Sequence, residues 1–191
     1  MAHKFDPRNI EKLEDPSRLE LFAPEETLRR LGLARGQVAL DVGTGTGFYL
    51  PYLSALVGPE GRVYGVDVQE KMLEVARRKI LDKGLTNVEL VHSEENRIPL
   101  PDRVADFVFL AFTFHELREP LRFLRELRRV ARPSAALGLI DWKKKERDKG
   151  PPPEEVYAEE EVLRFLKEGG LEVEEVFDLG PYCFAVRGRF P

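Results

Sequence analysis

Short apolar stretches alternate along the chain with longer segments in which apolar residues recur every three or four positions. The short stretches are typical of buried parallel strands, and the periodic segments are typical of amphipathic helices. This pattern predicts strands at 38–42, 62–68, 88–92, 105–112, 136–142, 171–178 and 182–189. It predicts helices from Pro24 to Gly32 and at 48–57, 69–83, 120–131 and 158–168. Strands that alternate with helices predict an α/β fold with a mostly parallel sheet.

The connections between these elements differ in character. The short link at Gly180 and Pro181 predicts that the last two strands form an antiparallel hairpin. The segment RPSA at 132–135 predicts a turn before the strand at 136–142, and the charged, proline-ended segment 143–153 is expected to be the least ordered part of the chain. A stripe of arginines along 118–132 is expected to be a solvated face paired with Glu119 and Glu126.

The stretch 38–48, VALDVGTGTGF, combines an apolar run with three glycines at alternate positions. Such a break predicts a buried strand that turns sharply into a helix, with glycine where the backbone takes positive φ or lies against a ligand. Asp41 ends the strand beside this loop, and the free N–H groups of the next helix face it. The stretch therefore predicts a small-molecule pocket that contains a carboxylate.

A second acidic residue, Asp67, ends the next strand about 20 residues beyond the glycines, the distance expected for a carboxylate that binds ribose hydroxyls. Asp67 could instead cap the following helix. A dinucleotide fingerprint requires a third glycine where this chain has Phe48, which argues against a dehydrogenase.

The motifs together resemble class I S-adenosylmethionine-dependent methyltransferases. The resemblance rests on the pattern Asp-x-Gly-x-Gly-x-Gly at 41–47, on Asp67, and on Glu94 followed by the segment IPLPD at 98–102. It covers about residues 24–191 and is closest to the ubiquinone/menaquinone-biosynthesis type. It implies a Rossmann-like sheet of seven strands in the order 3-2-1-4-5-7-6, with strand 7 antiparallel and helices on both faces.

The resemblance also implies a cofactor, S-adenosylmethionine, and residues that hold it. Asp41 would anchor the amino group of the cofactor, Asp67 the ribose and Glu94 the adenine amino group, while Glu95 offers a backbone N–H to the ring. Met72 would pack against the adenine. The full implied set is Asp41, Gly43, Thr44, Gly45, Gly47, Asp67, Val68, Met72, Glu94, Glu95 and Ala111.

Methyl transfer from a sulfonium depends mainly on orientation, and a base is needed only where the acceptor loses a proton. His115, just beyond the fourth strand, is the first candidate for that base, and Asp141 at the end of the fifth strand is the second. An apolar acceptor site is expected to be walled by Tyr49, Phe112, Phe114 and Trp142. His3, Lys4 and Phe5 are candidates for a lid.

The chain of 191 residues is long enough for one domain with a core. We expect an N-terminal arm or lid at 1–23, a cofactor-binding core at 24–142, and a C-terminal helix and hairpin at 154–191. The net charge of −4 does not favour nucleic acid, and one cysteine, Cys183, is consistent with a reducing cytoplasm. The 34% of charged residues hints at a thermophile.

No apolar stretch suits a membrane span or a signal peptide, and the three histidines show no spacing of metal ligands. The leading function is methyl transfer to a small molecule. An RNA or protein methyltransferase, and a module that binds the cofactor without turnover, are the alternatives. The sequence leaves the oligomeric state open, with a homodimer as one option.

Overall fold

The computed structural model describes residues 21–191, so most of the predicted arm at 1–23, including His3, Lys4 and Phe5, lies outside the described residues. The strands are β1 Val38–Val42, β2 Arg62–Asp67, β3 Val88–His92, β4 Ala105–Ala111, β5 Ala131–Trp142, β6 Glu172–Leu179 and β7 Cys183–Arg189. The α-helices are α2 Pro24–Arg30, α3 Leu50–Val57, α4 Glu70–Lys83, α5 Pro120–Val130 and α6 Glu159–Glu168. The short 3-10 helices η2 Phe114–Glu116 and η3 Pro153–Glu155 were not predicted.

The described strands form one sheet in the order β3-β2-β1-β4-β5-β7-β6. Strands β1 to β5 pair in parallel, whereas β7 runs antiparallel to both β5 and β6. This order and the terminal hairpin confirm the predicted fold. The reversal of strand order on either side of β1, where β2 lies on one side and β4 on the other, leaves a crevice at the carboxyl ends of these strands.

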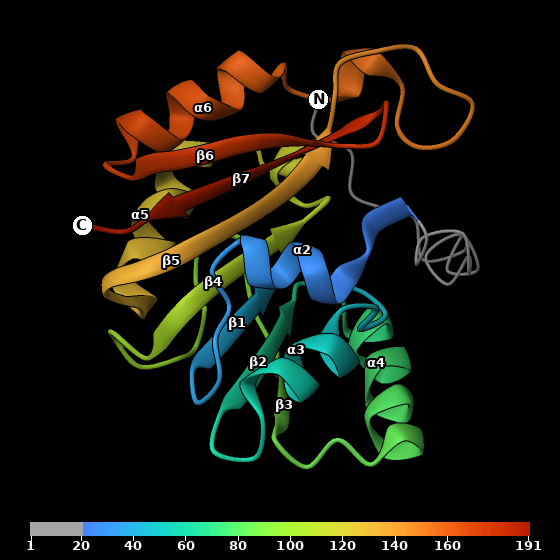
Figure 1. Cartoon of the computed structure of the whole chain (residues 1–191), viewed down its shortest axis with the longest axis vertical. Helices are drawn as coiled ribbons and strands as arrows, with labels where there is room; N and C mark the ends of the chain where they lie inside the picture. The colour runs from blue at the N-terminus through green and yellow to red at the C-terminus, as the bar shows by residue number, and fades with distance from the viewer. Residues whose placement is uncertain (1–20) are drawn as a thin grey trace.

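Helices cover both faces of the sheet (Figure 1). On one face, α2, α3 and α4 contribute to an apolar cluster that includes Leu28, Leu53 and Ala76. On the other face, α5 and α6 contribute Leu127 and Leu166 to a second cluster. Both faces of the central strands are therefore buried, which explains why these strands read as almost continuous apolar runs.

The fifth strand begins earlier than predicted. Ala105 pairs with Ala131, and the next pair joins Phe107 to Ala136, so the residues predicted as a turn form an irregularity within β5. Ser134 at the centre of this irregularity has a positive φ of 63°. The turn chemistry was identified correctly, but pairing on both sides of it extends the strand back to the end of α5.

Two arginines of the stripe on and beside α5 pair with the expected glutamates. Arg122 contacts Glu119, and Arg129 donates both to Glu126 and to Asp102. Arg129 also donates to the backbone carbonyls of Ile98 and Leu100, and so ties α5 to the segment before β4. No described helix is long and apolar enough to cross a bilayer.

Candidate active site

A cavity of about 920 Å³ opens at the carboxyl ends of β1, β2 and β4. Its wall includes ten of the eleven residues predicted to bind the cofactor: Asp41, Gly43, Thr44, Gly45, Asp67, Val68, Met72, Glu94, Glu95 and Ala111. The eleventh, Gly47, does not line the cavity and lies close to Leu50 and Ala76. His115 also lines the cavity, so the predicted cofactor-binding residues and the first predicted base lie around one cavity.

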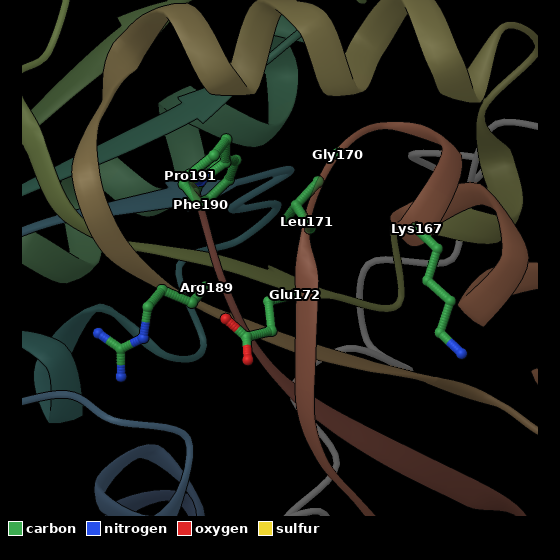
Figure 2. A pocket seen from close by; sticks show the side chains of 7 residues that line it. All are labelled: Lys167, Gly170, Leu171, Glu172, Arg189, Phe190 and Pro191. Atoms are coloured by element: carbon green, nitrogen blue, oxygen red, sulfur yellow. The ribbon is translucent and has the colours of Figure 1, made fainter.

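A second, smaller pocket of about 380 Å³ lies elsewhere, beside the end of α6 and the C-terminus (Figure 2). Its residue Arg189 pairs with Ala136 near the beginning of the parallel part of β5, at the opposite end of the sheet from the glycines. The described residues that line this pocket include none of the predicted site.

The glycine loop has the conformation that the sequence predicted. Gly43, Gly45 and Gly47 have φ angles of 72°, 55° and 76°. A Cβ on Gly43 would lie 2.3 Å from Oγ1 of Thr113, and one on Gly47 would lie 2.8 Å from Leu50. These two positions require glycine both for backbone conformation and for packing, and α3 consequently begins at Leu50 instead of at 48.

Asp41 is a buried carboxyl group in the wall of the cavity, with 2% of its surface exposed. Its pKa is raised to about 7, chiefly by burial; the hydrogen bond from Thr44 at 2.6 Å opposes this rise, and the charge of Asp67 adds to it. Within residues 21–191, Asp41 forms no ion pair with a basic side chain. A cationic group in the cavity would therefore be strongly favoured beside it.

Asp67 holds the glycine loop in place. One carboxylate oxygen accepts a hydrogen bond from the backbone N–H of Gly45 at 2.8 Å, and the other accepts from that of Gln69 at 2.8 Å. Asp67 thus fixes the glycine loop at the wall of the cavity.

The segment after β3 forms the next part of the wall. Glu94 and Arg97 exchange backbone hydrogen bonds in a tight turn, and a side-chain oxygen of Glu95 accepts from the backbone N–H of Arg118 at 3.1 Å. Buried Ser93 also lines the cavity and was not predicted. Met72 is 2% exposed and contributes an apolar surface.

The two predicted catalytic residues form a hydrogen-bonded pair. Nδ1 of His115 lies 2.7 Å from Oδ1 of Asp141, and the backbone N–H of His115 donates to Oδ2 at 2.9 Å. Oδ1 also accepts from the backbone N–H of Trp142 at 2.8 Å. Asp141 does not line the cavity itself, so it acts on the site only through His115.

This pairing sets the protonation of His115, whose side chain is 9% exposed. Burial lowers the pKa of His115, but the charge of Asp141 and its hydrogen bond raise it more, and the resulting pKa lies above the ordinary value. When the ring is neutral, Nδ1 carries the proton and donates it in the hydrogen bond to Asp141. Nε2 is then the ring nitrogen that can accept a proton. The pair therefore has the geometry that a histidine acting as a general base requires.

Aromatic side chains line another part of the cavity. The Phe112 ring lies 5.0 Å from that of Phe22 and 4.8 Å from that of Trp142, and all three line the cavity with Tyr49. The expectation for Phe114 was wrong: its side chain is fully buried and packs against Tyr157 and Phe165. Phe112 has a positive φ of 58°, an unusual conformation for a bulky residue.

Arg147 is a wall residue that the sequence did not reveal. It belongs to the segment 143–152, which has no helix or strand, yet its guanidinium lies 5.0 Å from the Trp142 ring centroid. Its Nε donates to the carbonyl of Pro151 and its Nη1 to that of Lys143. The only signal in the sequence was a single arginine among lysines.

Residues 40–139 match a family described as "Methyltransferase domain". The match spans more than half of the chain. The chain belongs to this methyltransferase family.

A solved structure of a SAM dependent methyltransferase from Aquifex aeolicus is 60% identical, with a TM-score of 0.96, over 98% of this chain and 100% of that one. Together with family membership, this similarity implies S-adenosylmethionine as the cofactor. The demethylmenaquinone methyltransferase of Geobacillus kaustophilus is 38% identical over 57% of this chain and 47% of its own length. The chain thus spans about half the length of the curated relatives that it matches. The [4+2]-cyclase SpnF, at 20% identity and a TM-score of 0.76 over 88% of this chain and 80% of its own, shares the fold alone.

Proposed function

We propose that the protein transfers a methyl group from S-adenosylmethionine to a small molecule, with His115 as the general base. The observation that carries this proposal is that one cavity is lined both by the glycine loop with its two carboxyl groups and by His115, which is held by Asp141. Family membership supports the reaction class, and the arrangement of residues in this chain supports the proposed roles.

The residues of the cavity suit the cofactor. Asp41 is a buried carboxyl group without a basic partner among the described residues, and the cofactor carries an amino group. Asp67 lines the cavity and would accept hydrogen bonds from the ribose hydroxyls. Met72 offers an apolar surface to the adenine, and Glu94 with Glu95 would receive its polar edge. Once bound, S-adenosylmethionine supplies a methyl group on a positively charged sulfur.

The remaining chemistry belongs to the protein. Nε2 of His115 would take a proton from the acceptor, because Nδ1 is committed to Asp141. Asp141 fixes the tautomer and the orientation of the ring, and it stabilises the imidazolium that forms. The aromatic side chains would hold the acceptor flat and exclude water, which keeps the reacting atoms in line.

An aromatic acceptor fits this site best. The aromatic wall of Phe22, Phe112 and Trp142 favours a flat ring, and the curated relatives act, by name, on demethylmenaquinone. We infer a reduced naphthoquinone-like ring as the acceptor.

We further infer a single domain in which 24–142 hold the cofactor and 154–191 complete the sheet beside the acceptor. The protein would be cytoplasmic and would come from a thermophile. It would not act on nucleic acid, and a homodimer is the oligomeric state to be tested. The net charge of −4 argues against nucleic acid, and the one cysteine supports a reducing compartment.

The test is binding and turnover measured side by side. Calorimetry with S-adenosylhomocysteine should give binding to the wild type and to His115→Asn, and none to Asp67→Ala. Transfer of a labelled methyl group to 1,4-dihydroxynaphthalene should fall by roughly 10²-fold or more in His115→Asn, which keeps an amide to bond Asp141 but has no base. His92→Asn, at an exposed histidine outside the cavity, is the matched control and should match the wild type.

Two results would contradict the proposal. If S-adenosylhomocysteine does not bind, the assignment of the cavity is wrong. If His115→Asn turns over the acceptor as fast as the wild type does, His115 is not the base. Binding without any methyl transfer would favour a module that holds the cofactor without turnover.

A further inference from the structure

Arg147 is held in the cavity wall by the backbone of its own segment. Nε donates to the carbonyl of Pro151 at 2.9 Å and Nη1 to the carbonyl of Lys143, four residues away on either side. The guanidinium also lies over the ring of Trp142. These contacts hold the segment 143–152 in a folded conformation along the cavity wall.

The third nitrogen of the guanidinium, Nη2, makes no such hydrogen bond to the described residues. Nη2 is shielded from solvent, and among the described residues it donates a hydrogen bond to no atom. A buried cationic donor without an acceptor is costly, and most such groups in proteins are satisfied. Because Arg147 lines the cavity, a bound molecule can supply the missing acceptor. An adjustment of the segment 143–152 is needed to bring an oxygen to Nη2.

The charge of Arg147 acts on the proposed base. It lowers the pKa of His115, and the pKa of Arg147 is itself lowered by burial and raised by the charges of Cys183, Asp141 and Glu146. An arginine stays a cation in proteins, so this part of the cavity carries a permanent positive charge close to the group that removes a proton. A negative charge that develops on the acceptor would be stabilised there.

We propose that Arg147 selects the acceptor by binding a negatively charged oxygen carried on an aromatic ring that packs among Phe22, Phe112 and Trp142. This inference rests on the proposed function and names its substrate class and a residue that recognises it. The oxygen is either a phenol oxygen or a carboxylate. For a phenol, the O–H bond breaks, the proton moves to Nε2 of His115, and the electron pair stays on the oxygen that faces Arg147. A carboxylate arrives already ionised.

The test uses probes of one shape and different charge. Calorimetry at pH 8 would compare 1-naphthol, 1-naphthoate and neutral 1-naphthalenemethanol, with the protein free and saturated with S-adenosylhomocysteine. The wild type should bind at least one of the two acidic probes roughly tenfold or more tightly than the neutral one, as a charge-assisted hydrogen bond provides. Which acidic probe binds identifies the kind of oxygen.

Substitutions distinguish an effect of the Arg147 charge on probe binding from an effect on folding. Arg147→Met should lose the preference between probes, and Arg147→Lys should keep part of it. Lys144→Met removes a positive charge from the same segment at an exposed side chain outside the cavity, and should behave as the wild type does. Unfolding midpoints show whether each variant is folded.

The inference is overturned if the wild type prefers neither acidic probe, or if folded Arg147→Met keeps the preference. Failure of S-adenosylhomocysteine to bind contradicts the proposed function instead, and the titrations of the free protein then still decide the role of Arg147.

Discussion

Replacement of Asp41 by Asn should stabilise the empty protein at alkaline pH while it weakens cofactor binding. Asp41 is buried, and only Thr44 donates a side-chain hydrogen bond to it among the described residues. An Asn side chain has nearly the same shape and can still accept the bond from Thr44, but it never ionises. The variant therefore removes the cost of a buried charge with little change in packing.

The size of the effect can be worked from the pKa. Burial, opposed by the Thr44 hydrogen bond, raises the pKa of Asp41 from 3.8 to about 7. Because the folded-state pKa lies above the unfolded one, folding takes up a proton between these values. The stability contributed by the neutral acid is complete below pH 3.8 and is lost as pH rises through about 7. A shift of about 3 pH units corresponds to at most ~4 kcal/mol.

Urea unfolding of wild type and Asp41→Asn from pH 4 to pH 8.5 measures this difference. The free energy of unfolding of the variant, relative to the wild type, should rise across the window by up to ~4 kcal/mol. Calorimetry in buffers of different ionisation enthalpy should detect a proton released when S-adenosylhomocysteine binds the wild type near pH 7, and none for the variant. A stability difference that stays constant with pH would refute the reasoning.

Three further perturbations test other contacts. In a urea titration, Gly43→Ala should lower the free energy of unfolding by about 2–4 kcal/mol, because the φ of Gly43 is 72° and an added Cβ would meet Thr113. The control Gly36→Ala should lower it by only about 1 kcal/mol, because Gly36 has a similar φ of 80° but open space around it. Asp141→Asn should slow methyl transfer roughly 10²-fold or more and move the acidic limb of the pH–rate curve to lower pH, since Asp141 raises the pKa of His115; an unmoved limb would contradict the pairing. Arg129→Leu should lower the free energy of unfolding by about 1–3 kcal/mol, because Glu126 and the carbonyls of Ile98 and Leu100 each lose a hydrogen bond from the guanidinium. An unchanged thermal midpoint would show that these bonds contribute little.

The sheet and the cofactor end of the cavity could be predicted because local sequence determines them. The three glycines have positive φ, and Asp67 follows at the distance that parallel neighbouring strands impose. Such features depend on a strand, a turn and a helix that are adjacent along the chain.

The acceptor end could be predicted only in part. His115 and Asp141 were alternatives in the sequence, and the pairing of β4 with β5 makes them partners. Phe114 was assigned to the wrong side because the positive φ of Phe112 ends the alternation of the strand. Arg147 could not be found, because the path of a long irregular segment depends on contacts with Trp142 and with its own carbonyls that no periodicity reports.

Two of the three bonds to the carboxylate of Asp141 come from His115 and join the end of β5 to the segment after β4. The third comes from the neighbouring Trp142, and none of the three involves a residue beyond it. The proposed base is therefore held by β5, whereas Arg147 belongs to the segment 143–152, which has no helix or strand. The proposed base and the proposed selecting residue therefore lie on different segments of the chain. A library that varies 144–151 and retains Asp141 should therefore alter which acceptors are methylated without a change in affinity for the cofactor.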